Sequence, residues 1–226
     1  MNVTLSAITQ PLIRTADNVR YLTVDEFIVY CARVSNPSNQ LNTLSAPNLI
    51  KYCLKHEHWS IFEQASMTFE IQTSRDISAQ IIRHRSFSFQ EFSQRYSKVT
   101  ALENFNIRKQ AEKNRQSSSE NMEMTEEENA EIKNYLLSGL YLYNKWVDKG
   151  AAKESMRKIL PLCSQTTLYM TGSVRSWIHY VNVRTSPETQ EEHRLIAENV
   201  KLILCNLIPS VADALEWSKP AKENVE

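Results

Sequence analysis

The N-terminal part of the chain has apolar residues spaced three or four positions apart, as on one face of a helix. In residues 23–35, Phe27, Cys31 and Val34 follow this spacing. Residues 46–56 begin after a serine and carry a proline in their first turn, which favours a helix start. We therefore predict helices over both ranges.

Helix boundaries are marked more clearly in the C-terminal half. Thr125 and Glu128 have the spacing of a capping box, and the helical pattern after them continues to about residue 146. Gly150 then supplies the residue type that commonly ends a helix. Two more helices are expected, one over 173–183 and a final one over 186–215 that starts with a serine–proline pair.

A different period appears in the middle of the chain. Residues 66–73 alternate, with Met67, Phe69 and Ile71 on one side and polar residues on the other. This period of two is typical of a half-buried strand, and a second strand is expected over 168–171. The pattern favours an α+β chain, in which a small, mainly antiparallel sheet packs against several helices.

Residues 111–129 differ from the rest because they are polar, serine-rich and acidic, with few side chains to bury. Such a composition predicts a mobile surface loop. No internal repeat and no linker divides the chain, so we predict a single domain over residues 1–226.

Composition narrows the possible partners. The 226 residues are 42% hydrophobic, which is enough for a sizeable core. Lys and Arg together number 26, as do Asp and Glu, so no chain-wide basic field favours nucleic acid. We find no basic leader before an apolar core and no run near the roughly 18 apolar residues of a membrane span. We expect a cytoplasmic protein without a nucleic-acid or membrane partner.

Cysteine and histidine spacing argues against a metal. Cys31, Cys53, Cys163 and Cys205 are far apart, which predicts reduced thiols and not a zinc site or disulfides. Two histidines flank Glu57, but side chains two positions apart on a helix diverge, so no metal site is expected.

Glycine scarcity limits how phosphate could be bound. Only Gly139, Gly150 and Gly172 occur, and both the Walker loop and the GxGxxG turn need several glycines close together. Any phosphate must therefore be held by side chains.

Suitable side chains gather in RHRSFSFQEFSQRYS, residues 83–97. A helical pattern that starts at Asp76 predicts that a helix carries the front of this motif. On a regular helix Arg83 and Arg85 would diverge by about 200°, at roughly 100° per residue, so they would face two ligands or two subunits unless the helix ends there. Taken alone, the stretch also fits a solvated helix end or a stacking surface for single-stranded nucleic acid.

The motif resembles the signature of the flavin-dependent thymidylate synthases, which has an RHR triplet, seven intervening residues and a serine, here Ser93. Other segments resemble the same family, in the family's order: CARVS at residues 31–35, HEHWSIFEQASMTFEI from residue 56, and MRKILPLCSQTTLYMTGSVRSWIHYVNVRTSPETQEE from residue 156. The similarity extends over about residues 25 to 210.

The resemblance implies an enzyme that methylates dUMP to dTMP. Its co-substrates would be methylenetetrahydrofolate as carbon donor and NADPH as reductant, with FAD as hydride carrier. It also implies a homotetramer whose active sites lie at subunit interfaces.

Site residues follow from the same resemblance. The residues expected to bind dUMP are Gln80, Arg83, Glu91, Ser93, Gln94, Arg95, Arg157 and Arg184. Those expected to bind FAD are Ser60, Arg83, His84, Arg85, Glu91, Ser173, Val174, Arg175 and His179, and His58 is expected near the flavin and folate.

Chemistry agrees with these roles. Arg184, the expected catalytic residue, is a permanently charged donor that can stabilise charge on a uracil ring. Because the family needs no covalent enzyme nucleophile, Ser93 is interpreted as a positioning donor. The chain departs from the family at Ser173 and His179, where asparagine is frequent, and at Gln94, where glycine is frequent.

Two function classes follow from the sequence. One is the flavin- and folate-dependent methyltransferase. The other is a nucleotide or single-strand binding protein that uses the same arginines without turnover.

Overall fold

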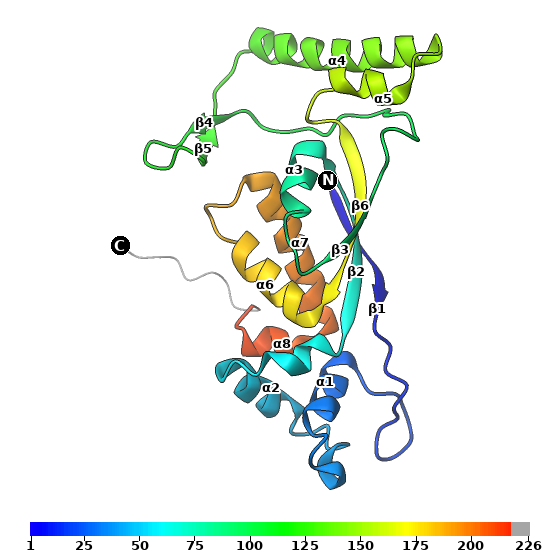
Figure 1. Cartoon of the computed structure of the whole chain (residues 1–226). Coiled ribbons are helices and arrows are strands. Elements are labelled where there is room, and N and C mark those ends of the chain that lie inside the picture. Colours follow the sequence, from blue (N-terminus) through cyan, green and yellow to red (C-terminus); the bar gives the residue numbers. More distant parts are fainter. Residues whose placement is uncertain (218–226) are drawn as a thin grey trace. The chain divides into compact units, whose positions relative to one another are not determined.

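The computed structural model describes residues 1–217 (Figure 1). Its strands are β1 (Asn2–Ile8), β2 (Ser66–Ser74), β3 (Ser88–Glu91), β4 (Arg108–Gln110), β5 (Ser118–Asn121) and β6 (Gln165–Ser173). Its α-helices are α1 (Val24–Ala32), α2 (Ala46–Lys55), α3 (Arg75–Ile81), α4 (Glu126–Asp148), α5 (Lys153–Met156), α6 (Val174–Arg184), α7 (Glu191–Leu207) and α8 (Pro209–Ala214). Three 3-10 helices are η1 (Pro37–Asn39), η2 (Trp59–Glu63) and η3 (Arg157–Ile159). The predicted α+β class is confirmed.

Four strands form a small antiparallel sheet in the order β1-β2-β6-β3. In β2, Met67, Phe69 and Ile71 are at most 1% exposed and alternate with half-buried polar residues, so the predicted half-buried strand is confirmed. β6 alternates in the same way but is longer than the predicted range 168–171. Its ends are polar, and pairing through the backbone leaves no apolar signal there.

The chain forms two compact units, each built from separate stretches. Unit 1 consists of residues 1–4, 70–170 and 186–196. Unit 2 consists of residues 5–69, 171–185 and the described residues from 197 on. The single domain over 1–226 stays a prediction, and its residues 218–226 lie outside the described part of the chain.

Unit 2 is mainly helical, with α1, α2 and α8 in mutual contact. Ile28 and Ile50 are fully buried in it. The indole of Trp177 on α6 is also buried and donates to the carbonyl of Met67 at 3.2 Å. This packing and hydrogen bond fix α6 in its unit.

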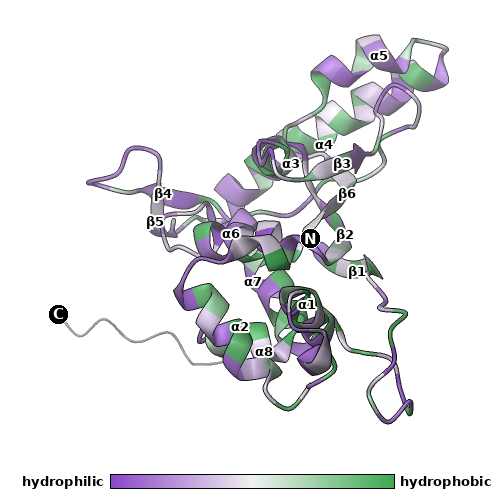
Figure 2. Ribbon diagram, turned by 60° about the horizontal axis from the view of Figure 1, so that its bottom comes forward, coloured by the Kyte–Doolittle hydropathy of each residue, from purple (hydrophilic) through white to green (hydrophobic). Residues whose placement is uncertain are grey.

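In unit 1, α4 begins with the predicted capping box. The Glu128 N–H donates to Thr125 Oγ1 at 3.2 Å, and the Thr125 N–H donates to Glu128 Oε2 at 2.8 Å. Gly150 follows the helix with a φ of 94°, which favours glycine. α4 contacts α5 and η3, and Tyr143 is its only buried residue. Figure 2 shows hydrophobic and hydrophilic residues mixed along this helix.

Two predicted segments differ from the structure. The single helix over 186–215 is wrong, because α7 starts at Glu191 and Pro209 opens a separate helix, α8. Proline has no N–H to donate, so it cannot continue α7. Residues 111–129 contain β5, which pairs antiparallel with β4, and the start of α4. The mobility of this range stays a prediction.

None of the helices within residues 1–217 combines the length and apolar character needed to cross a bilayer.

Candidate active site

The predicted site residues divide between the two units. Unit 1 carries Gln80, Arg83, His84, Arg85, Glu91, Ser93, Gln94, Arg95 and Arg157. Unit 2 carries His58, Ser60, Ser173, Val174, Arg175, His179 and Arg184.

The RHR triplet lies in a turn after α3, so the prediction that a helix carries the front of the motif is wrong. α3 ends at Ile81, and the backbone N–H groups of Arg83 and His84 donate to the carbonyls of Gln80 and Ile81 at 3.3 and 3.1 Å. The chain then enters β3, and the alternation of serine and phenylalanine over residues 86–89, which leads into this strand, is a strand period that the helical interpretation overlooked. The angle of about 200° expected between Arg83 and Arg85 on a regular helix therefore does not apply.

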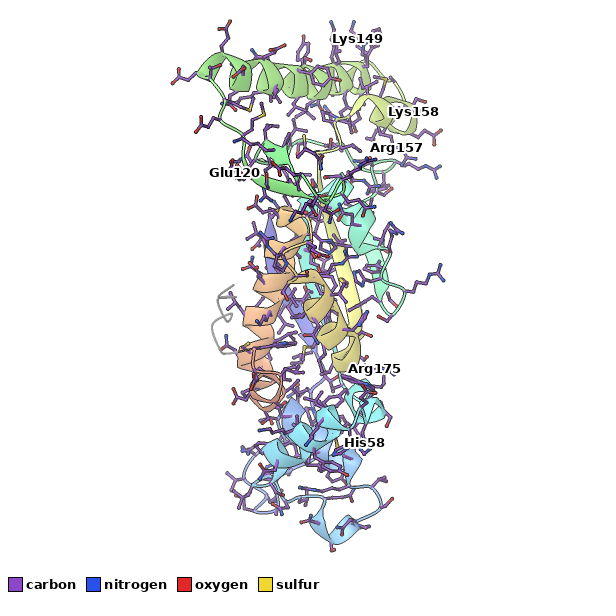
Figure 3. All side chains as sticks on the ribbon, turned by 90° about the vertical axis from the view of Figure 1, so that its left-hand side faces the viewer. His58, Glu120, Lys149, Arg157, Lys158 and Arg175 are labelled. Carbon is purple, nitrogen blue, oxygen red and sulfur yellow. The ribbon has the colours of Figure 1, made fainter. Side chains whose placement is uncertain are left out.

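Three of the predicted site residues of unit 1 are exposed arginines without a carboxylate partner within residues 1–217. No ion pair joins Arg83, Arg85 or Arg157 to an acidic group within residues 1–217. Arg157 begins η3 and is labelled in Figure 3. By contrast, Arg95 pairs with Glu154 at 3.2 Å. An anion can bind the three unpaired guanidinium groups without breaking an existing ion pair.

Glu91, at the end of β3, is held in one orientation. Its Oε1 accepts from Ser78 Oγ at 2.6 Å and from Thr166 Oγ1 at 3.0 Å, and Arg75 forms an ion pair with the same oxygen. The side chain is 18% exposed. Since three donors already fix the carboxylate, it can present an acceptor to a ligand without losing much side-chain freedom on binding.

Sequence reasoning missed the three residues that hold Glu91. Ser78 and Arg75 lie on α3, and Thr166 lies on β6, 75 positions from Glu91 in the sequence. No local pattern links such distant positions. The four-residue spacing of the buried Ile77 and Ile81 does, however, predict the helix α3, which carries Ser78.

Ser93 and Gln94 lie in the turn that follows β3. The carbonyl of Ser93 accepts from the N–H groups of Tyr96 and Ser97 at 3.0 and 2.9 Å. Ser93 is exposed, whereas Gln94 is only 8% exposed. Ser93 can therefore reach a ligand directly, while a contact of Gln94 with a ligand depends on that small exposed fraction.

In unit 2, η2 and the start of α6 bring several predicted flavin residues together. The two elements are in contact, and the Val174 N–H donates to the carbonyl of Ala65 at 2.9 Å. Arg175 pairs with Glu63 of η2 at 3.1 Å. His58 is the N-cap position of η2 and Ser60 lies within it, so both lie near the start of α6. Figure 3 labels His58 and Arg175 in this part of the unit.

α6 presents an exposed polar face beside a buried apolar one. Arg175 and His179, four positions apart, are exposed, while Val174, Trp177 and Ile178 are buried. Ser173 is the N-cap, because its Oγ accepts from the Ser176 N–H at 3.3 Å. A flavin contact of Ser173 would have to share this oxygen with the helix cap.

Arg184 is half-buried in the last turn of α6, one turn after Tyr180. Burial raises the pKa of the Tyr180 hydroxyl, and the positive charge of Arg184 opposes that rise. Arg184 is therefore a cation in partly dry surroundings, where an interaction with a ligand is stronger than in open solvent.

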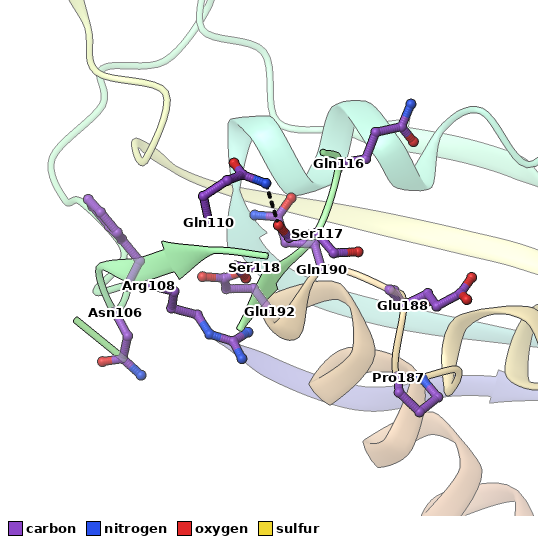
Figure 4. Close-up of a pocket in the computed structure, with 12 residues that line it drawn as sticks. Asn106, Arg108, Gln110, Gln116, Ser117, Ser118, Pro187, Glu188, Gln190 and Glu192 are labelled. Carbon is purple, nitrogen blue, oxygen red and sulfur yellow. Dashed lines mark hydrogen bonds between the residues drawn. The ribbon is translucent and has the colours of Figure 1, made fainter. Parts of the chain in front are cut away.

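A polar pocket of about 310 Å³ lies in unit 1 between the β4–β5 hairpin and residues 187–192 (Figure 4). Gln110 Nε2 donates to the Ser117 carbonyl at 2.8 Å across the hairpin. None of the predicted site residues lines this pocket, but its lining residue Gln190 contacts Gln80. The pocket therefore adjoins a residue expected to bind the nucleotide.

The donor set fits a nucleotide and a flavin dinucleotide. Guanidinium, imidazole and hydroxyl groups can bind phosphates and ring carbonyls from side chains alone, as the glycine scarcity requires. No group of three or more His, Cys, Asp or Glu in residues 1–217 is placed to hold a metal ion. Burial raises the pKa of all four cysteine thiols, which disfavours a thiolate nucleophile.

Comparison with known proteins identifies the family of the chain. A family model described as thymidylate synthase complementing protein matches residues 19–210, a range that contains all the predicted site residues. A probable flavin-dependent thymidylate synthase of Paramecium bursaria Chlorella virus 1 is 46% identical over 96% of this chain and 100% of its own. The flavin-dependent thymidylate synthase of Synechocystis is 48% identical over 87% of this chain and 91% of its own.

The fold agrees as well. A crystal structure of the UMP/dUMP methylase PolB from Streptomyces cacaoi, bound with 5-Br dUMP, has a TM-score of 0.79 at 24% identity, over 96% of this chain and 94% of that one. The fold and the family match define the class, that of thymidylate-forming enzymes. Within it, the chain belongs to the flavin-dependent thymidylate synthase family, and the predicted resemblance is confirmed.

Proposed function

We propose that this enzyme methylates dUMP to dTMP, with methylenetetrahydrofolate as carbon donor and NADPH as reductant. The observation that carries the proposal is the family match over residues 19–210 together with the donor set inside it. That the Streptomyces methylase of the same fold binds a brominated dUMP supports a pyrimidine nucleotide as substrate. Four free thiols fit a reducing compartment, so the proposal places the enzyme in the cytoplasm.

In this proposal the unit 1 arginines bind the anionic end of dUMP. Arg83 and Arg157 are exposed and have no carboxylate partner within residues 1–217. Arg95 would give up its solvent-exposed ion pair with Glu154 to bind the nucleotide, at little cost because such pairs are weak. Ser93 and Gln80 donate hydrogen bonds, and Glu91 accepts one. Arg184 stabilises negative charge that develops on the uracil ring.

FAD supplies the hydride chemistry of the reaction when it is bound. Arg85, His84 and Arg83 on unit 1 would contact it, together with Glu91. On unit 2 the contacts would come from Ser60, Val174, Arg175, His179 and Ser173, with His58 toward the folate. Arginine and histidine side chains would neutralise the pyrophosphate, which no glycine loop can reach here.

We further propose that the enzyme is a homotetramer with active sites at subunit interfaces. Support comes from an exposed stripe along α4 and its C-cap residue Lys149, hereafter the α4 stripe, composed of Glu128, Glu131, Tyr135, Leu142, Trp146 and Lys149. These side chains lie within an arc of about 60° on the helix, at roughly 100° per residue. Tyr135, Leu142 and Trp146 are 75%, 43% and 47% exposed, which is costly for a helix that faces only water.

The α4 stripe is complementary to itself when two copies run antiparallel. The same register places Tyr135 opposite Leu142 of the second copy, and Glu128 opposite Lys149. The acidic N-terminal turn then faces the basic C-terminal end, a charge arrangement that favours the pairing. A self-complementary patch of this kind is what a two-fold interface requires.

The test of the proposed function starts from the colour of the purified protein. We expect a flavin absorbance band that NADPH bleaches without oxygen, and dTMP formation from dUMP when methylenetetrahydrofolate is added. Omission of each co-substrate in turn is the control. Protein that stays colourless after incubation with FAD, yet binds dUMP, would instead support a nucleotide-binding protein without turnover.

A further inference from the structure

A buried histidine connects two of the predicted site residues in unit 1. His193 lies in the first turn of α7 and is 0% exposed. Neither the motif near Arg83 nor the family resemblance identified it. A buried imidazole in hydrogen-bonding distance of a ligand residue is a frequent means of orienting that residue.

His193 and Gln190 together fix the amide of Gln80. Gln80 Nε2 donates to Gln190 Oε1 at 2.6 Å, and His193 Nδ1 lies 3.3 Å from Gln80 Oε1. An amide oxygen only accepts, so the hydrogen bond requires a proton on Nδ1 of His193. With its oxygen and one N–H engaged, Gln80 keeps one N–H in a defined direction for a ligand acceptor.

The other side of His193 meets a predicted flavin residue. The rings of His193 and His84 are 6.3 Å apart between centroids and nearly perpendicular, at 87°. His84 also contacts the ring of Phe87 edge-on at 6.3 Å. The edge contacts on His84 restrict its rotation, which defines where the imidazole can present its nitrogens.

We propose that His193 is a positioning residue that aligns Gln80 for dUMP through its Nδ1–H and His84 for the flavin through its ring. The inference rests on the proposed function, because it takes dUMP and flavin as the ligands of these two residues. His193 touches neither ligand itself.

Two substitutions separate the two roles. His193→Phe keeps a ring beside His84 but removes the donor to Gln80. His193→Asn keeps an N–H near the position of Nδ1 but removes the ring. Loss of one net hydrogen bond corresponds to about a tenfold weaker affinity. The dissociation constant of dUMP, measured by calorimetry on flavin-loaded protein, should therefore rise about tenfold in His193→Phe, and flavin content should stay.

His193→Asn should show the reverse pattern, with dUMP affinity close to that of the parent and a lower flavin content. His56→Phe, at an exposed histidine in unit 2, is the matched control and should change neither quantity. Gln190→Ala changes an exposed residue and should weaken dUMP binding in the same direction as His193→Phe. It keeps the inference testable if a His193 variant fails to fold.

A double-substitution cycle distinguishes positioning from general damage. In a Gln80→Ala background, His193→Phe and Gln190→Ala should have no further effect on dUMP affinity, because the amide that they orient is gone. The inference would be overturned if His193→Phe and Gln190→Ala both left dUMP affinity unchanged, or if their effects on dUMP affinity added fully to that of Gln80→Ala. Either result would leave the proposed function intact. A parent protein that bound no dUMP would overturn the proposed function and this inference together.

Discussion

Arginine side chains differ in this chain by whether a carboxylate accompanies them. Arg20 pairs with Glu26, and Arg75 pairs with Glu91. Arg83, Arg85 and Arg157 have no such partner within residues 1–217. Surface ion pairs contribute little to folding, so these guanidinium groups can turn to an anionic ligand at little cost in stability.

Arg184→Ala should lower turnover on the order of a hundredfold or more, since a charged donor aimed at developing negative charge typically contributes about 3 to 4 kcal/mol to the transition state. Arg184→Lys should rescue little, because an ammonium group cannot reproduce a planar fork of two donors. The measurement is dTMP formation at saturating dUMP, beside NADPH-driven flavin reduction. Flavin content is the control, and parent-rate dTMP formation in Arg184→Ala would show that the role assigned to Arg184 is wrong.

A second prediction concerns Asp25, which is 3% exposed. Burial raises its pKa from 3.8 to about 6, against the opposing effect of the Ser210 N–H, which donates to Oδ2 at 2.7 Å. The folded protein thus holds this proton more tightly than the unfolded chain. The resulting stability is present below about pH 4 and is lost as the pH rises through about 6.

Asp25→Asn removes this titration but can still accept from Ser210. The free energy of unfolding of the variant, relative to the parent, should therefore increase by about 2.4 kcal/mol between pH 4 and pH 7, at about 1.4 kcal/mol per pKa unit. Urea unfolding at several pH values measures it. Parallel pH profiles for the two proteins would contradict the assignment.

At the scale of elements, short-range chemistry made the helix starts predictable. Thr125 and Glu128 form the expected capping box, and Gly150 has the expected positive φ. The same reasoning failed where two patterns compete. Residues after Ile81 continue a polar sequence compatible with a helix, yet they enter β3, because pairing with β6 depends on residues far along the chain.

The α4 stripe gives a prediction at this scale. Leu142→Glu places a carboxylate opposite Tyr135 of the second copy, where an unpaired buried charge costs several kcal/mol. We expect the dissociation constant of the assembly to rise on the order of a hundredfold and the mass in light scattering to fall below that of four chains. Asn134→Glu, on the polar face of the same helix, adds the same charge and should leave the mass unchanged.

If Leu142→Glu assembled like the parent, the α4 stripe would not be the interface. A fall in mass for Asn134→Glu as well would mean that any added charge on α4 disturbs assembly, and the stripe would again lose its special role.

At the scale of the whole molecule, the sequence predicted the class of fold and the family, while much of the support around the site stayed hidden. Arg184 and the RHR triplet are recognisable because their motifs are local. Thr166, Gln190 and His193 are not, because each acts on a residue at least 75 positions away. Such contacts depend on strand order and helix packing, which no short pattern encodes.

The last prediction tests whether a site draws on two chains. Arg83 belongs to the predicted residues of unit 1 and Arg175 to those of unit 2. If one flavin meets Arg83 of one subunit and Arg175 of another, Arg83→Ala and Arg175→Ala should each be inactive alone. Subunit exchange in an equal mixture should then restore roughly a quarter of the sites. These are the sites that receive Arg83 from an Arg175→Ala subunit and Arg175 from an Arg83→Ala subunit. A site built within one chain would always lack one arginine, so a mixture that stays inactive after proven exchange would exclude shared sites.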